Sequence, residues 1–334
     1  MPNSISKYAP IVIPTLCRYN CFIPCVESLE KCIGAEYTEV YVALDFPLND
    51  SHKEGYEKIC NYLESRNFKF KALHFIKREH NYGVSGKDSN VNVILRELWQ
   101  QYDRLILSED DNVFSSNFLQ FINKGLDIFE DDHTVDSICG YLDYYGIKTD
   151  GNTFYRCPNY FSAWGYATWK SRTEERKKIT TKYFRRSLSF RNLIKMAKLG
   201  RSRFLAYLGA ICPTNYLWIN DVNLGTYMIL EGKCQIRPSI SLVKNIGVDS
   251  GENFSSCAGE IANLYLKQPV STDTTFEFVG TGYEFQEENV KHCVHQEKLF
   301  HEKYHWITRK VVVKLTLKRV MKIILGCFGW KPKN

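Results

Sequence analysis

Three consecutive carboxylates, Glu109, Asp110 and Asp111, follow directly after an apolar run at 105–107. Crowding negative charges at the end of a buried strand costs free energy unless a cation or ordered hydrogen-bond donors compensate it. Hard divalent cations such as Mg²⁺ and Mn²⁺ take oxygen ligands, and Mg²⁺ usually keeps waters and substrate phosphates in its shell. The pattern therefore predicts a site for a divalent cation and a diphosphate. A solvated turn is the simpler alternative.

Thr15, Arg18 and Asp45 are three more polar residues near the ends of apolar runs. The runs that resemble strands cover residues 9–15, 39–45, 69–76 and 103–107. Helical patterns lie between them, at 23–33, 51–66 and 90–101. This alternation predicts a doubly wound α/β sheet with mostly parallel strands. Ligands bind beyond the carboxyl ends of such strands, so these side chains and the acidic triplet should share one site.

Two common nucleotide-binding patterns are absent from the sequence. No GxGxxG follows the first predicted strand and no GxxxxGK[ST] occurs, which argues against dehydrogenases and P-loop nucleoside triphosphatases. The 334 residues are within reach of one large α/β domain. A composition of 44% hydrophobic and 24% charged residues is typical of a globular protein.

The cysteines and the N-terminal residues indicate a compartment. Cys17, Cys21, Cys25 and Cys32 recur at the spacing of one helix face, and not as the paired CxxC of a zinc site. The first ten residues are polar and lack the apolar stretch of a signal peptide. We therefore expect a cytoplasmic protein with reduced thiols. No run of about 20 apolar residues is present, so no membrane-spanning helix is expected.

Three sequence blocks resemble GT-A fold glycosyltransferases. The first runs over 81–121, from Asn-Tyr-Gly-Val through the Glu-Asp-Asp triplet to Phe-Leu-Gln-Phe. The second is Phe-Ser-Ala-Trp-Gly-Tyr-Ala-Thr-Trp-Lys at 161–170, and the third is Ser-Leu-Val-Lys-Asn-Ile-Gly-Val-Asp at 241–249. Their order resembles bacterial family 2 glycosyltransferases and the related N-acetylglucosaminyltransferase I type. The resemblance covers about residues 8–255 and implies a Rossmann-like, mostly parallel central sheet flanked by helices.

The resemblance also implies roles for the acidic triplet. Asp111 would bind a divalent metal ion, Mn²⁺ or Mg²⁺, that bridges the diphosphate of a nucleotide-sugar donor. Asp110 would face the ribose, and Glu109 would face the donor sugar.

Further residues would complete the donor site by the same resemblance. Asp45 would meet the nucleobase, most commonly uracil in this family, and Thr15 with Arg18 would line the nucleotide pocket. The second and third blocks add three candidate substrate contacts, Trp164, Gly165 and Asp249.

Asp221, in the stretch 218–224, is at the position where this family carries its catalytic carboxylate. Such a group takes a proton from the acceptor hydroxyl as the bond to the sugar C1 forms, and in-line displacement inverts the anomeric centre. A helix N-cap is the alternative role for Asp221. The third block departs from the family pattern, because 249–254 contains no His. A late metal ligand from this loop is therefore open between Asp249, Glu252 and none.

Basic residues are concentrated in two stretches of this chain of net charge +7. In 170–203 only Glu174 and Glu175 oppose them, and such a cluster suggests nucleic acid, a phosphorylated substrate, a membrane surface or a solvated face. In 309–330 a lysine recurs every four residues among apolar side chains. This tail is typical of an interfacial membrane helix, and a helix packed on the domain is the alternative.

The sequence thus predicts a GT-A catalytic domain over 1–265 and a helical C-terminal extension over 266–334 that ends in the basic tail. The predicted protein is an inverting, metal-dependent hexosyl- or N-acetylhexosaminyltransferase of polysaccharide biosynthesis. It would use a UDP-sugar as donor and a glycan or lipid-linked molecule as acceptor. The protein would lie at the cytoplasmic face of the inner membrane, where its basic tail would contact the anionic surface, and no nucleic-acid partner is expected.

Two alternatives remain open at this point. A sugar nucleotidyltransferase also uses carboxylates and a metal, but normally carries a Gly-rich loop near its first strand. A non-catalytic module could bind membrane or nucleic acid through the two basic clusters. Such a module would not need the acidic triplet.

Overall fold

The computed structural model describes residues 8–84, 86–142, 151–158, 161–211, 220–247 and 269–284, together with Leu317 and Met321. The predictions for Asp249, Glu252 and most of the basic tail lie outside these residues. Leu317 and Met321 of the tail are helical and exposed.

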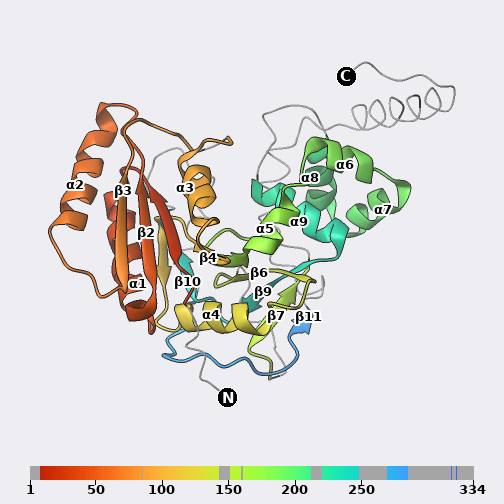
Figure 1. Cartoon of the computed structure of the whole chain (residues 1–334). Helices are drawn as coiled ribbons and strands as arrows, with labels where there is room; N and C mark the ends of the chain where they lie inside the picture. Colours follow the sequence, from red (N-terminus) through yellow and green to blue (C-terminus); the bar gives the residue numbers. More distant parts are fainter. Residues whose placement is uncertain are drawn as a thin grey trace.

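A nine-stranded sheet in the order β11-β7-β9-β6-β8-β4-β1-β2-β3 forms the centre of the described fold (Figure 1). Its strands are β1 Ile11–Thr15, β2 Glu39–Leu44, β3 Ala72–Lys77, β4 Arg104–Leu107, β6 Val135–Cys139, β7 Phe154–Cys157, β8 Tyr166–Trp169, β9 Cys234–Pro238 and β11 Tyr283–Glu284. Five of the eight pairings are parallel, and β8 runs antiparallel to both of its neighbours. The prediction of a mostly parallel α/β sheet is confirmed.

Helices cover both faces of the parallel half of this sheet. The helices are α1 Tyr19–Glu30, α2 Lys53–Glu64, α3 Asn90–Leu98, α4 Phe118–Ile128, α5 Lys170–Arg176, α6 Thr181–Ser187, α7 Phe190–Lys198, α8 Arg201–Ile211 and α9 Asn220–Glu231. Apolar side chains of α1, α2 and α4 share one core with β1 and β2. On the opposite face, Ile94 and Leu98 of α3 pack against Val12, Tyr41 and Ala43. Strands β1 and β2 are buried on both faces, which explains their apolar runs, while the edge strand β3 is only half-buried.

Helices α6 to α9 form a separate cluster with its own core (Figure 1). Phe184, Met196, Tyr207, Tyr227 and Met228 fill its centre and are shielded from solvent. This cluster lies beside the sheet, at the opposite end of the molecule from α2 (Figure 1).

A second, two-stranded sheet pairs β5 Asn112–Phe114 with β10 Val243–Asn245 in antiparallel register. Because β5 follows the acidic triplet directly, this pairing brings the third sequence block beside the triplet. Gly165 of the second block has a φ of +64°, a backbone conformation that glycine adopts most readily. A Cβ at this position would lie 2.9 Å from Val243 Cγ2, so glycine also permits the close packing.

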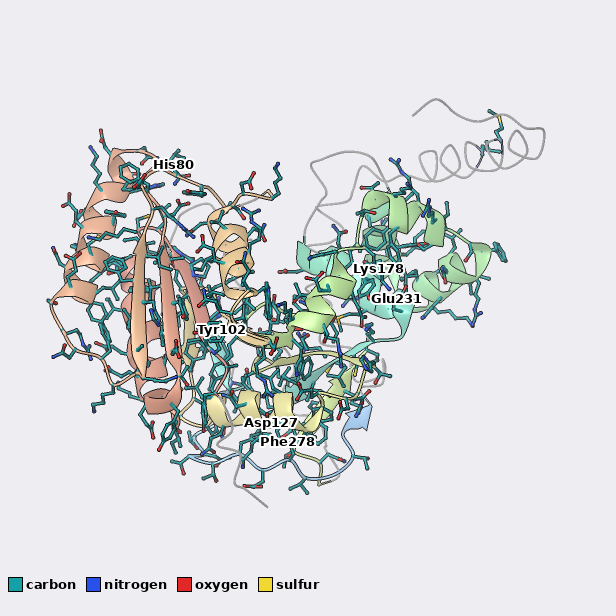
Figure 2. All side chains as sticks on the ribbon, in the orientation of Figure 1. His80, Tyr102, Asp127, Lys178, Glu231 and Phe278 are labelled. Carbon is teal, nitrogen blue, oxygen red and sulfur yellow. The ribbon has the colours of Figure 1, made fainter. Side chains whose placement is uncertain are left out.

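The segment 269–284, which we placed in the helical extension, is mostly irregular and ends in β11. Phe276 and Phe278 both pack against Phe121 of α4, with ring centroids 4.7 and 5.2 Å away (Figure 2 labels Phe278). Two side chains that are two residues apart share a face in an extended chain and not in a helix. This part of the predicted extension is therefore extended and belongs to the main core, while the boundary at residue 265 stays a prediction.

The helices of the described part are all too short or too polar to cross a bilayer.

Candidate functional site

Strands β1 and β4 deliver the first site residues to the same edge of the sheet. The two strands are parallel neighbours, with Ile11 opposite Ile106 and Val12 opposite Leu107. The polypeptide leaves the sheet at the carboxyl ends of both strands on the same edge, as the sequence predicts. Thr15 follows this geometry, and its Oγ1 donates a hydrogen bond of 2.7 Å to Asp110 Oδ2.

Arg18, just before the first turn of α1, binds both aspartates of the triplet. One guanidinium nitrogen donates to Asp110 Oδ1, and the other donates to Asp111 Oδ2 at 2.7 Å. The three side chains are largely buried, with exposed fractions of 19% for Arg18, 5% for Asp110 and 7% for Asp111. Burial disfavours the Arg18 cation, but the two carboxylates outweigh that effect and raise its pKa. Arg18 therefore compensates the crowded negative charge that the sequence shows.

The third sequence block is built around Asp111. Asn245 Nδ2 donates to Asp111 Oδ1 at 2.7 Å, and the backbone N–H of Ile246 donates to the Asp111 carbonyl at 2.8 Å. Asn245 Oδ1 in turn accepts from the Gly247 N–H at 3.0 Å. A Cβ on Gly247 would lie 2.0 Å from Asp111 Oδ2, so only glycine fits there. The Asn-Ile-Gly pattern is thus explained by the need to hold one carboxylate, a role for Asn245 that sequence reasoning missed.

Glu109 differs from its two neighbours. In the described part of the chain its carboxylate makes no hydrogen bond or ion pair, and its side chain is only partly buried. Desolvation of the carboxylate, followed by the charges of Asp111 and Asp221, raises its pKa to about 8. Burial also raises the pKa of Asp110, although Arg18 opposes this. Glu109 is thus the member of the triplet whose carboxylate oxygens accept no hydrogen bond from the described residues.

Asp221 lies in the first turn of α9 and is exposed. Desolvation raises the pKa values of Glu109 and Tyr166, and the charge of Asp221 adds to both shifts, so Asp221 acts electrostatically on the acidic triplet. The helix begins at Asn220, so Asp221 is inside the first turn and is not the N-cap residue. A carboxylate there is also favoured by the helix dipole. The structure thus brings the predicted base and the predicted donor residues to one region.

Asp45 is at the carboxyl end of β2, as predicted, but its carboxylate is already engaged. Oδ1 accepts from the backbone N–H groups of Phe46 and Tyr82, and Oδ2 accepts from that of Gly83, at 2.8 to 3.0 Å. Asp45 therefore fixes the loop of the first sequence block, Asn-Tyr-Gly-Val. Its predicted contact with a nucleobase stays a prediction.

Trp164 and Gly165 support one wall of this region. The Trp164 ring packs edge-on against Tyr141, with centroids 4.5 Å apart. Gly165 is buried against the side chains of β10 and α4. These contacts explain the Trp-Gly pair by packing, and its contact with substrate stays a prediction.

A buried ion pair near the site also escaped sequence reasoning. Arg176 of α5 binds Asp136 of β6, with Nη2 to Oδ2 at 2.5 Å, and both side chains are largely buried. The guanidinium also lies 5.8 Å from the ring centroid of Tyr166, whose pKa Asp221 helps to raise. Arg176 belongs to the basic stretch 170–203, where sequence alone gave no reason to single it out.

Comparison with known proteins gives limited guidance. The chain matches no family model and no curated protein. It is similar to solved structures of S. aureus TarS (18% identity, 50% of this chain and 29% of that one, TM-score 0.32) and of TarS 1–349 in complex with UDP-GlcNAc (14%, 90% and 73%, 0.41). It is also similar to the mannosyltransferase PcManGT from Pyrobaculum calidifontis in complex with GDP-Man and Mn²⁺ (10%, 66% and 69%, 0.36).

The chain thus spans less than a third of the TarS chain in the first of these matches, and 58% of TarS 1–349 in another. Matches at this level do not identify an activity.

The carboxylates have the chemistry for a hard divalent cation, but they do not form a complete cage. Among the described residues no three His, Cys, Asp or Glu side chains are arranged around a common metal position. Asp111 has one oxygen on Arg18 and the other on Asn245, although a carboxylate has about four lone-pair positions. The site therefore fits a cation that takes one or two carboxylates and completes its shell with phosphates and water, provided that Arg18 shares Asp111 or moves away.

Proposed function

We propose that this chain is a glycosyltransferase that takes a sugar from a nucleotide-sugar donor. The observation that carries the proposal is the arrangement around Asp111. Two buried carboxylates at the carboxyl end of β4 are held by Arg18 and by Asn245 of the third block. A further exposed carboxylate, Asp221, lies close by on α9. Sugar transfer by displacement needs a site that binds the donor and a base that takes the proton of the acceptor hydroxyl.

The donor would lie at the carboxyl edge of β1, β2 and β4, where doubly wound sheets bind ligands. Thr15, Arg18 and the loop held by Asp45 border this edge and would receive the nucleotide. Arg18 has a planar fork of donors that suits phosphate oxygens. The base of the donor, with uracil as our proposal, and the identity of the sugar as a hexose or N-acetylhexosamine follow from the sequence resemblance alone.

Asp111, with Glu109 or Asp110 beside it, would hold the divalent metal ion. When bound, Mn²⁺ or Mg²⁺ would stabilise the negative charge on the departing diphosphate. Glu109, whose carboxylate has no partner among the described residues, would face the donor sugar or share the metal.

Asp221 would accept the proton of the acceptor hydroxyl as that oxygen attacks the sugar C1. Its position in the first turn of α9 leaves it exposed, so an acceptor can reach it from solvent. Attack from the side opposite the diphosphate would invert the anomeric centre. Asp221 would then lose its proton to solvent and be ready for a second turnover.

The remaining parts of the proposal concern acceptor and location. We propose a glycan or lipid-linked acceptor in polysaccharide biosynthesis and a cytoplasmic, membrane-peripheral enzyme whose basic tail contacts an anionic surface. The division into a catalytic domain over 1–265 and an extension over 266–334 is part of the same proposal. These points rest on sequence patterns that fall largely outside the described residues.

The test is a thermal-shift screen of UDP- and GDP-sugars with Mn²⁺ present, because a ligand specific to the native state raises its stability. Wild type and Asp131→Asn should be stabilised by the same donor, and Asp111→Asn should not. Asp131 is the matched control, since it is an exposed Asp outside the site. Equal stabilisation of all three proteins would overturn the donor site proposed here. Release of pyrophosphate in place of nucleoside diphosphate would favour a nucleotidyltransferase.

A further inference from the structure

The surface of α6, α7 and α8 combines exposed apolar side chains with basic side chains that form no salt bridge among the described residues, although Arg185 and Lys195 donate hydrogen bonds to the backbone carbonyls of Ile211 and Ile229. No Asp or Glu occurs between Lys177 and Ile211, a stretch that contains all three helices. The basic residues that are exposed on this surface are Lys182, Arg185, Arg186, Arg191, Lys195, Lys198 and Arg201. None of them takes part in a salt bridge to another described residue. We call these three helices and their exposed side chains the basic face.

Around the end of the neighbouring helix α5, in contrast, three consecutive basic residues form salt bridges. Arg176 binds Asp136, Lys177 binds Glu174, and Lys178 lies 3.4 Å from Glu231 of α9 (Figure 2). Among the described residues, most of the basic side chains of this stretch that lack a salt bridge therefore lie on the basic face. A solvated surface that served only solubility would not need all charges of one sign, since mixed signs do that equally well.

Helix α7 also exposes apolar side chains among the basic residues of this face. Met196 points into the helical core and is fully buried. Phe190 and Ile194 are one turn apart on another side of the helix, with exposed fractions of 79% and 42%. Figure 1 shows α7 at the outer edge of the molecule, away from the sheet. An exposed Phe and Ile on one helix face, surrounded by cations, is the pattern of a helix that lies in a bilayer interface.

We propose that the basic face docks on an anionic phospholipid bilayer, with Phe190 and Ile194 inserted among the headgroups and the surrounding Arg and Lys side chains on lipid phosphates. Nucleic acid is the competing partner for such charge. Bases stack on aromatic rings, which Phe190 could provide, but an exposed aliphatic side chain beside it gains little from a nucleic acid backbone. Both apolar groups gain from a bilayer interface, and this favours lipid.

The docked orientation has a consequence for the active site. Helix α9, which carries Asp221, shares the core of this helical cluster through Tyr227 and Met228. Docking would therefore hold the proposed base on the part of the molecule that is anchored to the bilayer, as a lipid-linked acceptor requires. The docking itself does not depend on the proposed glycosyl transfer, because it concerns exposed residues outside the site.

The experiment is co-sedimentation of the full chain with vesicles of phosphatidylcholine containing phosphatidylglycerol, compared with phosphatidylcholine alone. Phe190→Ser/Ile194→Ser and Arg191→Glu/Lys198→Glu should each weaken binding to the anionic vesicles by about tenfold or more. Ile240→Ser/Val279→Ser is the matched control, since both side chains are exposed apolar groups elsewhere, and it should bind like wild type. Binding should fall with salt, mainly through the charged residues.

The outcomes separate the alternatives. Because every variant retains residues 285–334, equal vesicle binding by wild type and both α7 variants would overturn the proposal and leave the tail as the anchor. Absence of vesicle binding by wild type, together with salt-sensitive RNA or DNA binding that the α7 variants lose, would assign the face to nucleic acid. The substituted side chains are exposed, so unchanged thermal unfolding is expected, and protection of α7 amides from hydrogen exchange by vesicles gives a second readout. Transfer to a soluble acceptor should be unchanged, which keeps this test independent of the proposed function.

Discussion

Replacing Arg18 by methionine removes the cation that compensates the acidic triplet. Methionine retains much of the apolar length of the side chain but has no charge and no donor. Asp110 and Asp111 would keep their bonds to Thr15 and Asn245, yet two carboxylates with exposed fractions of 5% and 7% would lose their ion pairs. Uncompensated charge in a buried position is among the costlier defects that a single substitution can produce.

The expected cost is about 3 kcal/mol. Removing one partner of a buried pair typically costs about 3–5 kcal/mol, and the two remaining hydrogen bonds favour the lower end. For a chain of this size that corresponds to a fall in Tm of about 4 °C. Arg104→Met is the matched control, because Arg104 pairs with Asp127 and Glu130, which are 44% and 53% exposed. Exposed pairs contribute about 0–1 kcal/mol, so its Tm should change little.

Divalent metal should reverse part of this loss. Without Arg18 the two aspartates are open to Mn²⁺ or Mg²⁺, and a cation that binds only the native state stabilises it by mass action. We therefore expect Mn²⁺ to raise the Tm of Arg18→Met more than that of wild type or Arg104→Met, in the absence of any nucleotide. Differential scanning calorimetry with and without Mn²⁺ measures both effects. Equal unfolding temperatures of Arg18→Met and Arg104→Met, or equal stabilisation of all three proteins by Mn²⁺, would contradict this role of Arg18.

Three further changes probe other contacts. The hydrogen bond from Lys71 lowers the pKa of Glu39 to about 2, with help from Tyr102 and against the effect of burial. The stabilising contribution of the Glu39 carboxylate is therefore complete above its unfolded pKa and is lost as pH falls through about 2. Glu39→Gln should be less stable than wild type by about 1–2 kcal/mol at pH 7 and equal to it near pH 2, as measured by urea unfolding. Gly247→Ala should cost about 1–3 kcal/mol and abolish donor binding, because its Cβ would meet Asp111 Oδ2 at 2.0 Å, and calorimetric titration checks this. Asp221→Asn should retain donor affinity and lower turnover by about a hundredfold, and loss of affinity instead would exclude it as the base.

The sequence predicts the parallel half of this fold because local signals and tertiary packing agree there. The runs at β1, β2 and β4 are mainly apolar, as is typical of strands buried on both faces, and each is followed by polar residues. The rule that ligands bind at the carboxyl ends of parallel strands then brings Thr15, Arg18 and the triplet to one edge, as the structure has them.

Other features depend on contacts that no local pattern encodes. The pairing of Arg18 with Asp110 and Asp111 joins residues more than 90 positions apart in the sequence. The sequence suggests that Asp45 contacts a ligand, but its carboxylate oxygens accept hydrogen bonds from backbone N–H groups that only the folded loop supplies. The segment 269–284 lacks an alternating apolar run long enough to predict a strand, and it becomes ordered because Phe276 and Phe278 fill a space over α4.

The measurement that tests the proposed activity most directly is the analysis of reaction products. Wild type, given the donor that stabilises it, Mn²⁺ and an acceptor, should release nucleoside diphosphate and form a glycoside whose anomeric configuration, read by NMR, is inverted relative to the donor. Asp111→Asn should form neither product, while Asp131→Asn should behave like wild type. Wild-type turnover by Asp111→Asn, or a product with retained configuration, would contradict the arrangement of metal, donor and base proposed for this site.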